Sequence, residues 1–302
     1  MTLDNIGTEE GCNSMDKPTQ PDTGEKIHRA VSDDGTEIAG RVHGEGPPLV
    51  LVPGAMSDGE TVWEPLLPFL TDRFTCYAMS TRNRGLSGQS TDHSPERLVQ
   101  DVTAFAESIG EPVGLMGWSG GGLFSLAAAQ KTDAISAVAA YEPAAFEVIT
   151  EDVSERMTDT IERVGEVAAE GRLSDAARIW VEFVANDDEL AWAEELGLFE
   201  VLAPNVPVQL REFEQIFESE WTSPTDPSEL AEITVPVLLL HGTQSVPVPW
   251  MTDSVRHVAE HVADSTVREI DDTGHTGPGH KPEAVADQVI RFFAATPDPP
   301  RS

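Results

Sequence analysis

The chain has 302 residues and a formal net charge of −34, with 53 acidic residues against 19 lysines and arginines. This excess of negative charge excludes a basic nucleic-acid-binding face, and no run of eighteen apolar residues is present to span a membrane. The length suits one domain of about 250 residues with an insertion.

The acidic residues are spread along the whole sequence rather than gathered in a tail. This distribution resembles that of proteins from salt-accumulating organisms, because molar salt shortens the Debye length to about 3 Å and screens the repulsion among acidic groups. In dilute buffer the same charge would destabilise the compact state. We therefore expect a halophilic protein.

The sequence carries few features of targeting or redox chemistry. Residues 1–25 lack the basic start and apolar stretch of a secretory signal, so we expect a cytoplasmic protein. The two cysteines, Cys12 and Cys76, make neither a disulfide framework nor a metal site. We expect a monomer or homodimer without membrane or nucleic-acid partners.

The first half of the chain alternates predicted strands with predicted helices. A turn signal at 33–36 predicts a hairpin over residues 27–42. Continuous apolar runs, as in buried parallel strands, follow at residues 49–52, 74–79, 113–117 and 134–141. Helical segments are expected at residues 95–109 and 123–130. This alternation predicts an α/β fold with a doubly wound, mostly parallel sheet.

The alternation stops at residues 144–232, which we interpret as an inserted helical cap. Helical periodicity is found there at residues 151–169, 173–185, 189–195 and 208–219. Strand and helix patterns resume at residues 235–240, 255–262, 267–270 and 282–294. The predicted organisation is a disordered acidic tail at 1–26, a core at 27–143 and 233–295, the cap, and a second tail at 296–302.

The strongest motif is Gly-Trp-Ser-Gly-Gly at 117–121, between a predicted strand and a predicted helix. This is the context of a nucleophile elbow, in which the serine occupies a strained turn and small flanking residues avoid clashes. Ser119 is therefore the predicted nucleophile. The helix N-terminus favours negative charge, and the N–H of Gly120 is the expected first oxyanion donor.

The second oxyanion donor is expected from the loop after the strand at 49–52, which reads Pro-Gly-Ala-Met at 53–56. The N–H of Ala55 is the first choice and that of Met56 the alternative. The side chains of Trp118 and Met56 are expected to line an apolar substrate pocket beneath the cap.

From about residue 27 to residue 294 the chain resembles an α/β-hydrolase with a helical cap. The resemblance rests on the Pro-Gly-Ala loop with Trp63, the elbow at Ser119, and two further pairs, His-Gly at 241–242 and Gly-His at 274–275. It implies a serine-hydrolase mechanism but names no substrate. Most members have His-Gly where this chain has Pro-Gly at 53–54, and residues 82–87 lack an acidic residue common there.

A serine hydroxyl needs a base to take its proton, and eight histidines compete for this role. The resemblance implies His275, and His280 in the same glycine-rich loop is the alternative. His241 ends a predicted strand, where a structural role is the more frequent one.

The acid that supports the base departs from the family pattern. Most members carry an aspartate shortly after the His-Gly strand, where this chain has Ser245. Some members carry the acid after the preceding strand instead, and there the chain has Glu142. A carboxylate at the tip of a buried strand needs a partner, so we expect Glu142 to be the acid. Asp253 and Asp226 are weaker candidates.

Together these residues predict a serine hydrolase that cleaves a small carboxylic ester, lactone or thioester through an acyl-enzyme. One alternative is a carbon–carbon bond hydrolase on the same site. Another is a non-catalytic ligand-binding protein on a hydrolase scaffold, which the missing aspartate at Ser245 favours. An ester-like small molecule is the expected substrate, and neither a cofactor nor a metal is expected, since no His/Asp cluster has ligand spacing.

Overall fold

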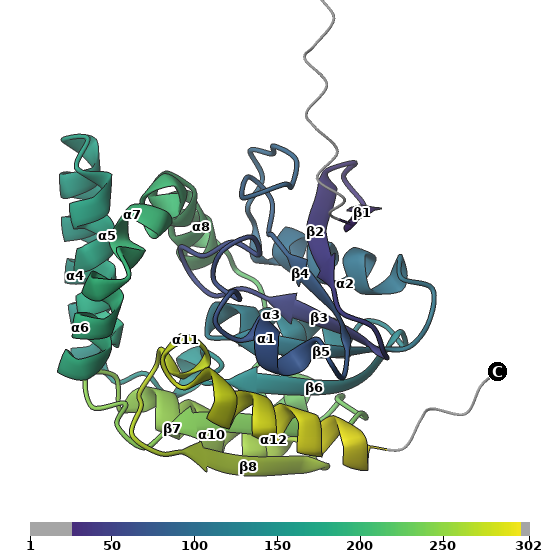
Figure 1. The fold of residues 1–302 in the computed structure, drawn as a ribbon. Coiled ribbons are helices and arrows are strands. Elements are labelled where there is room, and N and C mark those ends of the chain that lie inside the picture. The colour runs from purple at the N-terminus through teal and green to yellow at the C-terminus, as the bar shows by residue number, and fades with distance from the viewer. Residues whose placement is uncertain (1–25, 297–302) are drawn as a thin grey trace, which may run out of the picture.

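A computed structural model describes residues 26–296, and its centre is one eight-stranded sheet in the order β1-β2-β4-β3-β5-β6-β7-β8 (Figure 1). The pairs β1–β2 and β2–β4 are antiparallel and the other pairs are parallel. The predicted α/β fold with a mostly parallel sheet is therefore confirmed. The strands are β1 (Lys26–Val31), β2 (Glu37–His43), β3 (Pro48–Val52), β4 (Thr75–Met79), β5 (Val113–Trp118), β6 (Ile135–Tyr141), β7 (Val237–Gly242) and β8 (Ser265–Ile270).

Helices cover both faces of the sheet. One face packs against α2 (Pro95–Glu107), α3 (Gly120–Ala129) and α10 (Trp250–His261), and the other against α1 (Leu67–Leu70) and α12 (Pro282–Ala295). The central strands are apolar along their whole length because both of their faces are buried. In β5 all six residues are buried, which explains the continuous apolar run in the sequence.

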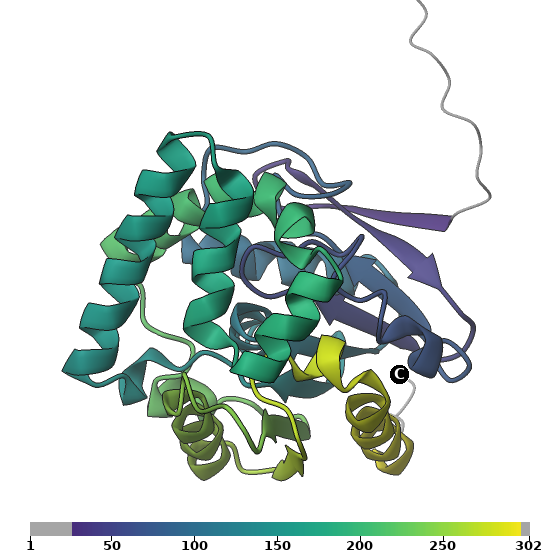
Figure 2. The ribbon, with the colours of Figure 1, turned by 60° about the vertical axis from the view of Figure 1, so that its left-hand side comes forward.

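Between β6 and β7 the chain forms the helices of the cap, and Figure 2 shows them standing beside the strand ends of the core. They pack around a cluster that includes Val164, Ala176 and Phe199. A second cluster, with Phe183 and Trp250, joins the cap to the core. The elements are η1 (Phe146–Val148), α4 (Glu151–Ala169), α5 (Leu173–Val184), α6 (Asp187–Glu195), α7 (Leu198–Leu202), η2 (Ala203–Asn205), α8 (Val206–Glu218) and α9 (Pro227–Leu230).

Several boundaries differ from those predicted. Lys26, assigned to the N-terminal tail, begins β1 and pairs with Val42. The short helices α1 and α7 were not predicted, because four or five residues carry too little periodicity. Residues 1–25 and 297–302, where tails were predicted, lie outside the described residues, and so does Cys12. Among the described residues, none of the helices is long and apolar enough to cross a membrane.

The segment after β4 carries two buried arginines. One forms an ion pair within the core, and the other forms an ion pair with the cap. Arg82 makes a bidentate ion pair with Asp101 of α2, with N–O distances of 2.7 Å. Arg84 points the other way, toward α8, and pairs with Glu212 at 2.7 and 2.9 Å. The Arg84 pair is buried on both sides, so it joins the cap to the core without contact with bulk water.

The Arg84–Glu212 pair predicts an acid-dependent step in stability. Burial acts to raise the pKa of Glu212, but the Arg84 guanidinium and His93 outweigh it and hold this pKa below the usual 4.5. A lowered folded-state pKa contributes stability above pH 4.5, and this contribution is lost as the pH falls further. Glu212→Gln should lower the free energy of unfolding at pH 7 by about 3–5 kcal/mol, because the Arg84 charge stays buried without its carboxylate partner. In urea unfolding, the difference in the free energy of unfolding between Glu212→Gln and wild type should shrink below pH 4.5. A difference that does not depend on pH would contradict the stabilising role of the Arg84–Glu212 pair.

Candidate active site

The strand β5 leads into a strained turn at Ser119, and α3 begins directly after it. Ser119 has φ 56° and ψ −123°, a conformation that few residues with a side chain adopt. The turn is possible because its neighbours are glycines. A Cβ at Gly117 would lie 2.3 Å from the carbonyl oxygen of Gly121, and one at Gly121 would lie 2.2 Å from that of Val52. The hydroxyl group is thus presented at the carboxyl edge of the sheet.

The carboxylate of Glu142 and the imidazole of His275 lie in direct contact. Glu142 Oε2 is 2.7 Å from His275 Nδ1, and both side chains are buried. The second carboxylate oxygen accepts hydrogen bonds from the N–H of Gly242, at 3.0 Å, and from the hydroxyl of Ser245. Ser245 therefore does not replace the family's aspartate as an acid; it donates a hydrogen bond to the glutamate that lies in contact with the histidine.

Two aromatic side chains of the core hold the backbone around His275. The indole N–H of Trp118 donates to the carbonyl oxygen of His275 at 2.8 Å, and the hydroxyl of Tyr141 donates to that of Gly274 at 2.6 Å. Burial raises the pKa of Tyr141 well above its usual value, so the hydroxyl keeps the proton it donates. Both residues come from the ends of neighbouring strands, which fixes the loop relative to Ser119.

The expected oxyanion donors lie beside Ser119. Ala55 and Gly120 line the same cavity as Ser119. The expectation that the Met56 side chain lines the pocket is wrong, and the N–H of Met56, the alternative oxyanion donor, already has a partner. Its N–H donates to Gln209 Oε1 at 2.7 Å, and its fully buried side chain packs into the cap cluster instead of lining either cavity around Ser119. Met56 has φ 58°, and this unusual backbone conformation accompanies its placement in the cap cluster.

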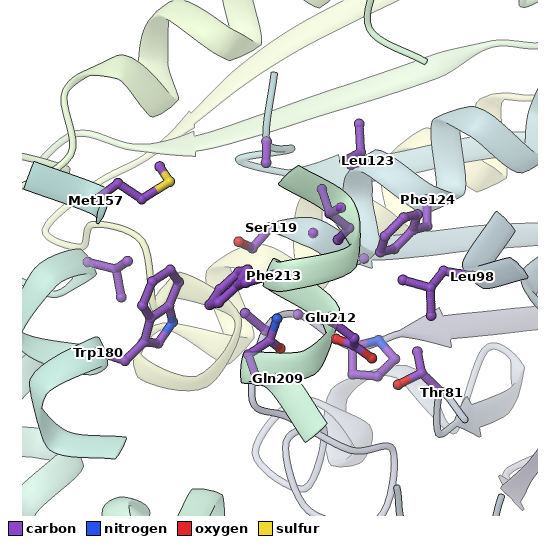
Figure 3. Close-up of a pocket in the computed structure, with 18 of the residues that line it drawn as sticks. Thr81, Leu98, Ser119, Leu123, Phe124, Met157, Trp180, Gln209, Glu212 and Phe213 are labelled. Atoms are coloured by element: carbon purple, nitrogen blue, oxygen red, sulfur yellow. The ribbon is translucent and has the colours of Figure 1, made fainter. Parts of the chain in front are cut away.

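Ser119 lies where two cavities meet. The larger cavity, of about 80 Å³, has mostly apolar walls and a polar end (Figure 3). Its apolar walls include Leu98, Phe124, Met157, Phe183, Phe213 and Trp250, and its polar end is made by Thr81, Arg84, Gln209 and Glu212. The smaller cavity, of about 50 Å³, is lined by His275 and Trp118 of the core and by Leu198 and Leu202 of the cap.

Residues 49–288 match the model of the alpha/beta hydrolase family. The chain belongs to this family. The match covers the elbow, Glu142, the cap and His275, so the resemblance described from the sequence is confirmed.

The individual relatives of this α/β hydrolase share about a third of its residues or fewer over the matched regions. A pimeloyl-[acyl-carrier protein] methyl ester esterase of Stenotrophomonas maltophilia is 33% identical over 138 residues, which are 40% of this chain and 52% of the relative. The chain thus spans about half the length of the curated relatives it matches. An α/β hydrolase from Sphaerobacter thermophilus is 27% identical with a TM-score of 0.69, covering 88% of this chain and 100% of that one. An esterase from Rhodococcus sp. ECU1013 is 22% identical with a TM-score of 0.72, covering 90% and 99%, and supports the fold alone.

The other residues considered from the sequence as base or acid of this α/β hydrolase have other hydrogen-bond or ion-pair partners. His280 Nδ1 lies 3.1 Å from the hydroxyl of Thr273, and burial lowers the His280 pKa. His241 Nδ1 lies 3.2 Å from the carbonyl oxygen of Gly242. Asp253 pairs with Arg256 on α10, and Asp226 caps α9 through Ser228.

Sequence reasoning missed the cap residues that reach the site. Gln209 and Glu212 lie one turn apart on α8 and approach the cavity together (Figure 3). Glu189 of α6 is fully buried beside the His275 loop. The only sequence signal was the capping pattern of Asn186 and Glu189, which marks a helix start but not a contact with a distant loop.

Proposed function

We propose that this α/β hydrolase is a serine hydrolase that cleaves small apolar carboxylic esters, lactones or thioesters through an acyl-enzyme. The observation that carries the proposal is the buried hydrogen bond of 2.7 Å between Glu142 and His275, next to the strained elbow of Ser119. A carboxylate on Nδ1 leaves Nε2 free to take the proton of the serine. Such a pair favours catalysis over a ligand-binding scaffold.

The reaction follows from this arrangement. Ser119 Oγ attacks the carbonyl carbon while His275 takes its proton, and the N–H groups of Ala55 and Gly120 stabilise the oxyanion. His275 then gives the proton to the departing alcohol as the C–O bond breaks. Water, deprotonated by His275, attacks the acyl-enzyme and releases the acid and the free serine.

The two cavities suggest where each half of the substrate lies. His275 lines the smaller cavity and not the larger one. Since the histidine must protonate the leaving group, we assign the smaller cavity to the alcohol and the larger one to the acyl group. A water molecule takes roughly 10–15 Å³ on the same measure, so the acyl cavity has room for roughly five to eight water-sized groups and the alcohol cavity for roughly three to five. Short, apolar groups fit both.

The proposal is tested with p-nitrophenyl esters of increasing acyl length, in molar KCl and in dilute buffer, with a fluorophosphonate as a label for the nucleophile. We expect turnover and labelling, highest with short acyl chains and in high salt, because salt screens the net charge of −34. A folded wild type that neither turns over nor labels would support the non-catalytic alternative. Cleavage of a vinylogous diketone but not of esters would support the carbon–carbon hydrolase.

The assignment of the cavities predicts a reciprocal change of selectivity. Phe213 lines only the acyl cavity and Leu198 only the alcohol cavity. Phe213→Ala should improve kcat/KM for longer acyl chains by about tenfold or more per fitted methylene, and Leu198→Ala should do so for longer alcohols. Each variant serves as the control for the other when both are assayed with esters that vary in acyl length and, separately, in alcohol length. If both variants shift the same half of the substrate, the assignment is wrong.

A further inference from the structure

The cap helix α6 sends one carboxylate into the loop that carries His275. Glu189 Oε1 accepts hydrogen bonds from the N–H of Gly274 and the N–H of Thr276, both at 2.9 Å, and from the hydroxyl of Thr273 at 3.1 Å. Gly274 and Thr276 flank His275 on both sides. One oxygen of the cap thus fixes the backbone immediately before and after the histidine.

This carboxylate is fully buried. Removing a carboxylate from water costs several kcal/mol unless hydrogen bonds compensate, so such a group is retained where it meets many donors. The other oxygen of Glu189 accepts from the N–H of Asn186 at 3.1 Å, and the Asn186 amide donates to the carbonyl oxygen of Gln244 at 3.1 Å. The first turn of α6 is therefore tied both to the His275 loop and to the loop after β7.

The contacts of Glu189 complement those from the core. Trp118 and Tyr141 bind carbonyl oxygens of the loop, at His275 and Gly274. Glu189 instead accepts hydrogen bonds from N–H groups of the same loop, at Gly274 and Thr276. The loop is held between the sheet on one side and the cap on the other. Within residues 26–296, Glu189 is the cap residue that makes hydrogen bonds to residues 273–276.

The cap makes an analogous contact on the opposite catalytic loop. Gln209 of α8 accepts the N–H of Met56 at 2.7 Å, directly after the proposed oxyanion donor Ala55. The same oxygen accepts from Arg84 at 2.8 Å, which fixes the amide in place. Two cap helices therefore each place one buried polar side chain on a loop of the site.

We propose that Glu189 is a positioning residue that orients His275, so that the docked cap completes the catalytic geometry in addition to covering the substrate. The inference rests on the proposed hydrolase function for its kinetic consequence. Without Glu189 the core contacts still hold the loop, but the N–H groups beside His275 lose their acceptor. The loop is then held from the core side alone and can shift the imidazole relative to Ser119, and a displacement of about 1 Å is enough to lower kcat by about 100-fold.

The test compares Glu189→Ala, Glu189→Gln and the matched control Glu195→Gln, which changes an exposed glutamate on the same helix. We expect kcat to fall about 10- to 100-fold in Glu189→Ala, with KM changed less than about twofold, since the substrate cavities are untouched. Glu189→Gln keeps one acceptor oxygen and should recover part of this loss. Glu195→Gln should match wild type.

Amide hydrogen exchange gives a readout independent of activity. The amides of Gly274 and Thr276 should be protected in wild type and exchange faster in Glu189→Ala, while the β5 amides stay protected. A folded Glu189→Ala with wild-type kcat and unchanged exchange at these amides would overturn the proposal. If wild type has no activity, the proposed function fails. Exchange at Gly274 and Thr276 that is the same in Glu189→Ala as in wild type would still refute the anchoring by Glu189. If Glu189→Ala does not fold, Glu189→Gln carries both measurements.

Discussion

Ser119→Ala is expected to remove ester hydrolysis almost completely, with kcat falling between about 10⁴-fold and 10⁶-fold. The reason is chemical: the alanine side chain offers no oxygen to attack the carbonyl carbon, and the other groups of the site cannot form the acyl-enzyme. Oxyanion donors and cavities remain, so some residual acceleration over water should persist. The measurement is steady-state hydrolysis of the best p-nitrophenyl ester, together with fluorophosphonate labelling followed by mass spectrometry.

Labelling separates the nucleophile from other reactive groups. Wild type should carry the label on the peptide with Ser119, and the alanine variant should carry none. Alanine fits the turn without added volume, so the variant should keep the wild-type thermal transition. Retained labelling, or activity within about tenfold of wild type, would show that another residue attacks the substrate.

Glu142→Gln is expected to produce the second-largest loss, about 10⁴-fold in kcat. The amide is similar in size, but it cannot stabilise the imidazolium that forms when His275 takes the proton. It can also present its NH₂ group to Nδ1, which favours the wrong tautomer of the ring. KM should change little, because Glu142 lines neither substrate cavity.

The hydrogen bond from Ser245 to Glu142 allows a sharper test of the acid's location. Glu142→Asn alone should be as impaired as Glu142→Gln, and asparagine tolerates the positive φ of 42° at this position. Adding Ser245→Asp to Glu142→Asn places a carboxylate where most family members have theirs, and part of the activity should return. If Glu142→Gln keeps activity within about tenfold of wild type, Glu142 is not the acid.

The sheet could be predicted because its signal is local. Buried parallel strands require continuous apolar runs, and those runs appear in the sequence at β3, β5 and β7. Ser119 was recognisable for a similar reason, since its strained turn requires glycines at fixed positions. Glu142 was a candidate because some members of the family that the chain resembles carry their acid after this strand, and a buried carboxylate there needs a partner.

The contributions of the cap could not be predicted in this way. Gln209 meets Met56 across 153 positions of sequence, and Glu189 meets Gly274 across 85. No short-range pattern encodes such contacts, because they depend on how the cap docks on the core. Met56 was misplaced for the same reason: its neighbours in the sequence belong to the site, but its side chain packs with the cap.

The two ends of the acyl cavity differ in polarity, and this difference affects how the cavity accepts the two enantiomers of a chiral substrate. The polar side chains of Thr81 and Glu212 lie at one end, and the apolar side chains of Met157 and Trp180 lie at the other (Figure 3). With the carbonyl group placed between Ser119 and the proposed oxyanion donors, a stereogenic carbon next to it directs its substituents into this cavity. When that carbon carries one polar and one apolar substituent, the two mirror images place these substituents differently against the polar end and the apolar walls. On the proposed hydrolase function, we therefore expect the two enantiomers of an α-substituted ester to be hydrolysed at different rates.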